Sequence, residues 1–201
     1  MFTSDIAFTP TVKAVQQARG SRRGYAHMEE GEGWATHITP DLAAFIAEQD
    51  SVFLATATAA GQPYIQHRGG PAGFLRVVDG DTIAFADFVG NRQYITSGNL
   101  SENPRAYLFM IDYAHARRVK IWGTAEISDD AALLASLMPA GYRARGEQVI
   151  LFKVAAWDIN CPQHIPQRFD AAAMAAALAE RDAHIAALEA EVKRLVAAAK
   201  P

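Results

Sequence analysis

From Ser51 to Ala156 the chain is a succession of short segments rich in β-branched and aromatic residues, separated by residues that form turns. This spacing is typical of antiparallel strands that close into a barrel or a sandwich. Gly123, inside one of these segments, predicts that another group approaches the strand closely at this point. The expected strands are residues 51–58, 64–68, 74–78, 82–85, 105–111, 117–127 and 149–156. The sequence therefore predicts a mainly β fold, a meandering antiparallel sheet with helices at its flanks.

Helices are expected on both sides of these strands. Thr39 is a good N-cap because Pro40 follows it at the first helical position, so a helix should begin here. A polar and mildly helical stretch follows at residues 91–100. Ser128 is expected to cap a further helix over residues 129–138.

The chain divides by composition into three parts. Residues 1–38 show little periodicity and are expected to form a lead that packs on the barrel, and residues 39–169 form the barrel domain. Residues 170–201 are rich in Ala, Glu, Lys, Arg and Leu, which predicts a long amphipathic helix. Six apolar residues of this helix fall on a heptad seam interrupted by Arg181, and they are Met174, Leu178, Ile185, Leu188, Val192 and Leu195. Two partners for this seam stay open, the same helix of a second subunit or the flank of the chain's own barrel.

Composition excludes several classes of function. A net charge of -3 over 201 residues lacks the basic excess of a nucleic-acid-binding protein. With Cys161 as the single cysteine, one chain can form neither a disulfide nor a cysteine-based metal site, and the histidines show no metal-ligand spacing. No apolar run is long enough to span a bilayer, and the first residues lack a signal-peptide pattern. We therefore expect a cytoplasmic protein with no metal, nucleic-acid or membrane partner.

Two segments place an arginine beside glycine. The first is Gln66-His67-Arg68-Gly69-Gly70, which ends a predicted strand. The second is Asp87-Phe88-Val89-Gly90-Asn91-Arg92-Gln93, in which Gly90-Asn91 forms a turn just where a helix could begin. If the two segments meet, backbone N–H groups and two guanidinium groups could converge on one anion, because glycine-rich turns and helix N-termini favour phosphate. The chain is therefore expected to hold a phosphorylated cofactor.

In their order and spacing, these and other motifs resemble the pyridoxamine 5'-phosphate oxidase-related flavoproteins, over about Thr39 to Arg168. The motifs are Ser51 to Ala57, Gly61 to Gly70, Gly90-Asn91-Arg92, Gly98 to Pro104, Arg117-Arg118 and Asn160-Cys161-Pro162-Gln163. The resemblance implies an FMN-binding split β-barrel. It also implies a homodimer in which the subunits associate through their barrels and FMN lies in a cleft at the interface.

The resemblance also implies cofactor-binding residues by position. Those on the strand after the first hairpin and at the following helix start are Gln66, His67, Arg68, Gly69, Asn91, Arg92 and Gln93. Arg68 and Arg92 are the implied phosphate ligands, and Arg118 would reach the ribityl chain, the phosphate or the flavin edge. The residues that would close over the cofactor are Asn160, Gln163, His164 and Arg168. Arg118 as a solvated or ion-paired strand residue and His67 as a half-buried strand histidine stay open as alternatives. No catalytic residue is assigned.

The implied function is a flavin-dependent oxidoreductase that acts on a small-molecule substrate or electron donor. The vitamin-forming oxidases end in a segment with arginine and histidine that closes the substrate site, whereas here residues 157–162 lead into an alanine-rich helix. Three alternatives therefore stay open. The chain could be a reductase or oxidoreductase for another small molecule, an FMN-binding module without turnover, or a relative that binds a deazaflavin or haem.

Overall fold

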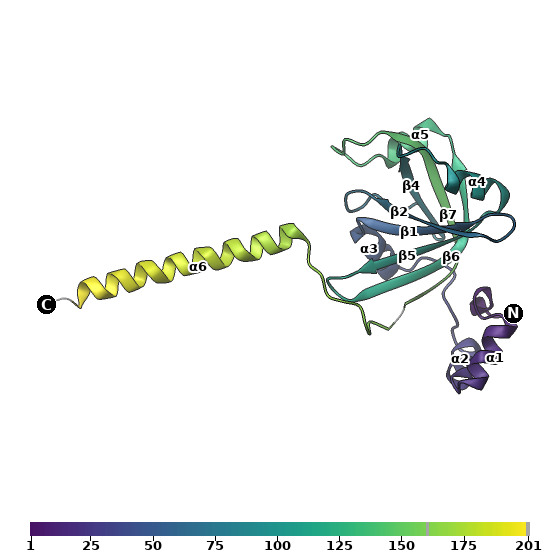
Figure 1. The fold of residues 1–201 in the computed structure, drawn as a ribbon, viewed down its shortest axis with the longest axis horizontal. Coiled ribbons are helices and arrows are strands. Elements are labelled where there is room, and N and C mark those ends of the chain that lie inside the picture. Colours follow the sequence, from purple (N-terminus) through teal and green to yellow (C-terminus); the bar gives the residue numbers. More distant parts are fainter. Residues whose placement is uncertain (160, 200–201) are drawn as a thin grey trace. The chain divides into compact units, whose positions relative to one another are not determined.

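The computed structural model describes residues 1–159 and 161–199. Among these residues, seven strands form one antiparallel sheet in the order β2-β1-β5-β6-β7-β4-β3, curled into a barrel (Figure 1). The strands are β1 (Ser51–Ala57), β2 (Pro63–Gly69), β3 (Arg76–Val77), β4 (Thr82–Phe88), β5 (Arg105–Asp112), β6 (Arg117–Ser128) and β7 (Gly146–Ile159). The prediction of a mainly β split barrel with flanking helices is confirmed.

The helices lie before, between and after these strands. They are η1 (Thr3–Ile6), α1 (Pro10–Ala18), α2 (Arg22–Glu30), α3 (Pro40–Glu48), α4 (Ile95–Glu102), α5 (Ala131–Leu137) and α6 (Ala171–Ala198). Thr39 caps α3, as predicted. The predicted cap of α5 is wrong, because Asp130 takes the place expected for Ser128. The Asp130 carboxylate accepts two backbone N–H groups of the first turn, which a single hydroxyl does less well.

The hydrophobic core fills the inside of the barrel. Inward-facing residues alternate along each strand, so that Val52 and Leu54 of β1 are fully buried next to Leu108 of β5. Phe74 and Leu75 are also buried in this core. They lie in a turn and leave only two residues for β3, so the strand predicted over residues 74–78 is shorter than expected. Burial of each such side chain contributes about 1.5–3 kcal/mol to stability.

Gly123 of β6 lies at a β-bulge, where the register with β7 shifts between Trp122 and Gly123. A Cβ atom at this position would lie 2.0 Å from the backbone oxygen of Lys153. No side chain fits at that distance, so the close approach predicted from the sequence is confirmed and glycine is required here.

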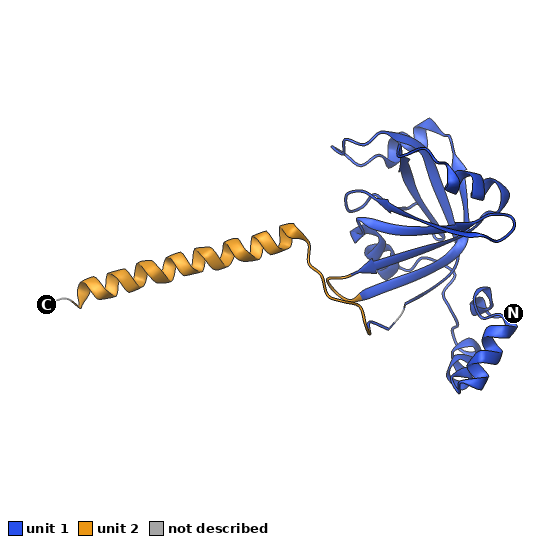
Figure 2. Cartoon of the chain, viewed as in Figure 1, with its two compact units in different colours: residues 1–112, 117–162 blue, residues 113–116, 163–201 orange. Residues whose placement is uncertain are grey.

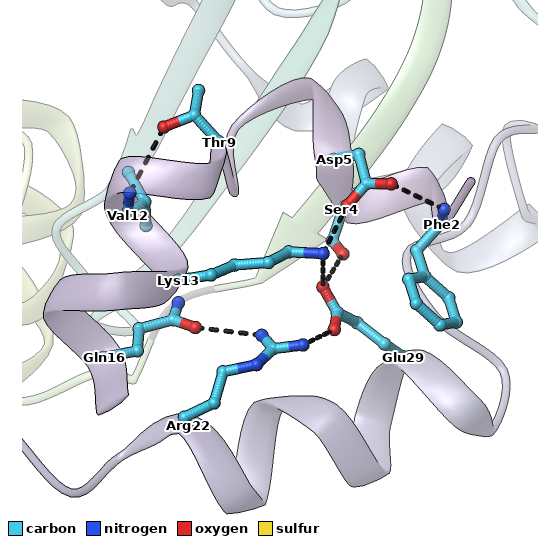
Figure 3. Close-up of polar contacts among 9 residues, drawn as sticks. All are labelled: Phe2, Ser4, Asp5, Thr9, Val12, Lys13, Gln16, Arg22 and Glu29. Atoms are coloured by element: carbon cyan, nitrogen blue, oxygen red, sulfur yellow. Dashed lines mark hydrogen bonds and ion pairs between the residues drawn. The ribbon is translucent and has the colours of Figure 1, made fainter. Parts of the chain in front are cut away.

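The N-terminal helices are joined by a buried carboxylate, that of Glu29 in α2 (Figure 3). It accepts a hydrogen bond from Ser4 Oγ at 2.8 Å, lies 3.2 Å from Lys13 Nζ and pairs with the guanidinium of Arg22. Burial raises the pKa of the Glu29 carboxyl, but the hydrogen bonds from Arg22, Ser4 and Lys13 outweigh it and hold this pKa below its usual value. The charged carboxylate therefore links η1, α1 and α2.

Trp34 connects the N-terminal helices to the sheet. Its ring stacks on Trp122 of β6 with the centroids 4.6 Å apart, and Phe8 contacts it edge-on at 5.0 Å. The ammonium of Lys120 lies over both indole rings, 5.4 Å and 5.3 Å from their centroids. Through these contacts the N-terminal lead packs on β6. The domain boundary predicted at residue 38 stays a prediction.

The described residues form two compact units (Figure 2). The first holds residues 1–112 and 117–162, and the second holds residues 113–116 together with the chain from residue 163 onward. Within the second unit, the Arg168 guanidinium lies over the Tyr113 ring at 4.6 Å, and the Asp170 side chain caps α6. The boundary predicted at residue 169 stays a prediction. No helix in the described part of the chain combines the length and the apolar character needed to cross a membrane.

Candidate anion-binding site

A polar cavity lies where β2, β4, β7 and the start of α4 meet. Because side chains alternate along a strand, Tyr64, Gln66 and Arg68 share one face of β2. All three line a cavity of about 260 Å³, together with residues 87–88, 90–97 and 147–148. The two arginine-glycine segments of the sequence therefore meet at one place in the fold.

Arg68 is held at the floor of this cavity. Its Nη1 lies 2.8 Å from Asp87 Oδ1, and its Nη2 donates to Thr96 Oγ1 at 3.3 Å. The Arg68 side chain is 21% exposed and that of Asp87 only 8%. The Nε atom of Arg68 is buried and has no hydrogen-bond partner in the described residues. An unsatisfied buried donor costs about 1–3 kcal/mol.

Asp87 ties Arg68 to the rest of the fold. Its Oδ2 accepts a hydrogen bond from Gln148 Nε2 at 3.0 Å, and the same amide donates to Ser97 Oγ at 3.1 Å. Side chains from β4, β7 and α4 thus fix the position of the Arg68 guanidinium. Such support holds a binding group in place before its ligand arrives.

The loop before α4 has an unusual backbone. Arg92 and Tyr94 have φ of 56° and 54°, the left-handed region that residues other than glycine seldom adopt. The helix predicted from residue 91 consequently begins only at Ile95, because left-handed Tyr94 occupies the N-cap position. Alternation of backbone handedness turns successive N–H groups toward one point and forms nests for anions. Strained residues of this kind cluster at ligand sites.

The side chains of this loop divide into bound and free groups. The Tyr94 hydroxyl donates to Glu147 Oε1 at 2.8 Å, and this bond, with some burial, raises the pKa of Tyr94. Asn91 Oδ1 accepts the Gln93 N–H at 3.3 Å. The guanidinium of Arg92 is exposed and forms no hydrogen bond or ion pair with any residue that the structure describes. Arg92 is therefore the cation at this cavity that remains available to a ligand.

The first turn of α4 adds partial positive charge. Tyr94 makes no side-chain cap, and residues 95–97 line the cavity. Uncapped N–H groups at a helix N-terminus carry about half a positive charge and favour a bound anion. Of the two carboxylates at the cavity, Asp87 is paired with Arg68 and Glu147 accepts the Tyr94 hydroxyl. The arrangement can therefore bind a compact anion such as a phosphate group.

The structure brings five of the residues implied by the resemblance to this cavity, namely Gln66, Arg68, Asn91, Arg92 and Gln93. It does not bring His67 or Gly69 there. The His67 ring faces the opposite side of β2 and contacts Phe53 edge-on at 5.6 Å, and a Cβ on Gly69 would meet that same imidazole. Their roles as cofactor ligands stay predictions.

The other implied residues lie on β6 or beyond it. Arg118 does not line the cavity, and its Nη2 donates to the Cys161 carbonyl at 3.2 Å. Gln163, His164 and Arg168 belong to the second unit, so their place relative to the cavity stays a prediction. Asn160 lies outside the described residues.

Sequence reasoning missed Thr96 and Gln148 as parts of the site, and it assigned no role to Asp87, the first residue of the second segment. Asp87 had a detectable signal, since it is a charged residue within an otherwise apolar strand and a buried charge requires a partner. Thr96 and Gln148 had none, because polar residues are common at the ends of helices and strands. Only the folded arrangement places them around Arg68.

Comparison with known proteins yields one family and several similar structures. The family model described as pyridoxamine 5'-phosphate oxidase matches residues 38–161. HupZ of Group A Streptococcus is 21% identical, with a TM-score of 0.51 over 66% of this chain and 99% of that chain. An FMN-binding protein from Syntrophomonas wolfei subsp. wolfei is 13% identical, with a TM-score of 0.49 over 72% of this chain and 97% of that chain. No curated protein matches the chain. The similarity to HupZ shows a shared fold.

Proposed function

The chain belongs to the pyridoxamine 5'-phosphate oxidase family, and from this premise we propose that it is a flavoprotein that binds FMN by its phosphate group. The observation that supports this most is the meeting of Arg68, Arg92 and the uncapped start of α4 at one cavity. Each can form charge-assisted hydrogen bonds to a dianionic phosphate. Arg68 would use the part of its guanidinium that is open to the cavity, and Arg92 its exposed guanidinium.

The size of the cavity indicates that it would hold only part of the cofactor. At about 260 Å³ it lies below the usual range for pockets that enclose a whole drug-sized ligand, roughly 300–1,000 Å³. It therefore suits the phosphate and the adjoining part of the ribityl chain. The ring system would lie outside it, against another surface.

An apolar outer face on the barrel supports a second copy as that other surface. Phe53 of β1 lies opposite Phe109 of β5, and Ala55 lies between Tyr107 of β5 and Ile65 of β2, on the side away from the core. Ile65 is 60% exposed. Antiparallel sheets usually present polar residues on a solvated face, so this face favours a partner. We propose that two copies form a homodimer through their barrels. Analytical ultracentrifugation that finds only a monomer at micromolar concentration would contradict this proposal.

The proposed activity is an oxidoreductase reaction with a small molecule. When bound, the isoalloxazine ring of FMN supplies the capacity to accept a hydride or electrons. The chain's own residues would bind the cofactor and orient it. Arg68 is fixed by Asp87 and Thr96, so it holds the phosphate end at a defined place. Tyr107 stays neutral on the outer face, because burial, with a smaller contribution from Asp158, raises its pKa to about 12.

Turnover is tested separately from binding. The flavin-loaded protein should be reduced by a nicotinamide nucleotide, seen as loss of the flavin absorbance band in the absence of oxygen. A bound flavin that no nicotinamide nucleotide reduces would leave FMN binding intact and favour an FMN-binding module without turnover.

Replacing Arg92 with alanine should weaken FMN binding by about 1.5–3 kcal/mol, or roughly 10- to 100-fold in Kd, because one charge-assisted contact is lost. Stability should change little, since the Arg92 guanidinium is exposed and unpaired among the described residues. Titration of the protein into FMN, followed by quenching of flavin fluorescence, measures the affinity.

Arg105→Ala is a matched control for Arg92→Ala. It removes the same charge from another exposed arginine, at the start of β5 and outside the cavity lining. Its FMN affinity should equal that of the wild-type protein at physiological salt. Equal losses in the two variants would mean that only net charge matters and would contradict a direct contact from Arg92.

A further inference from the structure

The helix α6 presents an apolar stripe that no other described residue of its own unit covers. None of its 28 residues is buried, and Figure 2 shows it as the main element of the second unit. The stripe residues are between 46% and 57% exposed, and they are Met174, Leu178, Ile185, Leu188, Val192 and Leu195. At 1.5 Å per residue the helix is about 42 Å long, which corresponds to four heptads. A stripe of this length needs a partner helix of similar length to cover it.

We propose that α6 pairs with α6 of a second copy as a parallel, in-register, two-stranded coiled coil. The residue types at the heptad seam support α6 of a second copy as the partner. Ile185 and Val192 are β-branched residues at a positions, and Leu188 and Leu195 are leucines at d positions. In a parallel coiled coil, this combination favours two strands over larger assemblies.

Charges beside the seam agree with the parallel arrangement. His184 occupies a g position and Glu189 the e position five residues later, the pair that a parallel coiled coil places opposite each other between chains. Neither side chain forms an ion pair within the described residues, whereas Glu191 is engaged by Arg194 of its own helix at 2.5 Å. His184 of each chain is thus placed to contact Glu189 of the partner subunit.

Arg181 interrupts the seam at a d position. In a parallel pair, a d side chain packs beside the following e residue of the other chain, and that residue is Asp182. Each Arg181 would therefore reach a carboxylate of the partner subunit. A polar residue at one seam position lowers stability but fixes the register. The outward f positions, Ala176, Ala183, Ala190 and Ala197, carry no group that would bind a third helix.

Cysteine cross-linking of the full-length chain tests the pairing directly. In a Cys161→Ser background, Leu188→Cys would place two thiols face to face across a parallel, in-register seam, within the separation that a disulfide requires. Oxidised glutathione should convert most of this variant to a covalent dimer. Ala190→Cys, two residues away on the outer face, is the matched control and should cross-link at least about tenfold more slowly, because f positions point away from each other.

Equal cross-linking of the two variants would overturn the proposal, and so would an absence of dimer in both. The first result would indicate random collisions, and the second an antiparallel pair or a helix that packs on its own barrel. Changes of charge beside the seam provide an independent test of the parallel register. His184→Glu should slow the cross-linking of Leu188→Cys by placing like charges between chains, and adding Glu189→Lys should restore it. Failure of this restoration would contradict the parallel register. None of these readouts requires a bound flavin.

Discussion

Replacing Arg68 with alanine should lower the free energy of unfolding of the FMN-free protein by about 3 kcal/mol, besides removing most FMN binding. Its ion pair with Asp87 spans 2.8 Å between β2 and β4, two strands that do not hydrogen-bond to each other in the sheet. Removal of one partner from a largely buried pair leaves an uncompensated charge, and such changes cost about 3–5 kcal/mol. We expect a loss at the low end of this energy range because the Arg68 side chain is partly exposed. Urea unfolding followed by circular dichroism measures the loss.

Neutralising Asp87 provides the control for Arg68→Ala. The double variant Arg68→Ala/Asp87→Asn should be more stable than the single variant by about 1 kcal/mol or more, because no buried charge remains unpaired. The asparagine carbonyl can still accept the hydrogen bond from Gln148. A single variant within about 0.5 kcal/mol of the wild-type protein would show that the pair does not hold β2 against β4. FMN binding should stay weak in both variants, since Arg68 is absent from both.

Most of the barrel could be predicted from local patterns. Buried and half-buried residues alternate over the whole length of β1 and over most of β5, and that pattern is visible in the sequence. The places where prediction failed depend on tertiary contacts. Phe74 enters the core and shortens β3, and Asp130 outcompetes Ser128 as a cap by offering a carboxylate. Neither outcome follows from propensity alone.

The site was predicted less completely than the fold. Arg68 and Arg92 stood out because each lies within two residues of a glycine in a turn-rich segment, and the fold brings both to one cavity. Asp87 and Thr96, which position Arg68, are ordinary residues until β2, β4 and α4 are assembled. The left-handed backbone at Arg92 and Tyr94 also has no sequence signature, because neither residue favours that conformation.

Riboflavin has the same ring system as FMN but no phosphate, so a comparison of the two flavins shows whether this cavity recognises the phosphate group. Two charge-assisted contacts, each worth about 1.5–3 kcal/mol, should make FMN bind at least about 100-fold more tightly than riboflavin. Fluorescence titration of the wild-type protein with each flavin, at the same salt concentration, gives the ratio. We expect FMN to bind at least about 100-fold more tightly than riboflavin to the wild-type protein. This ratio should be smaller for Arg92→Ala. Equal affinity for the two flavins, or no measurable binding of either, would contradict the account.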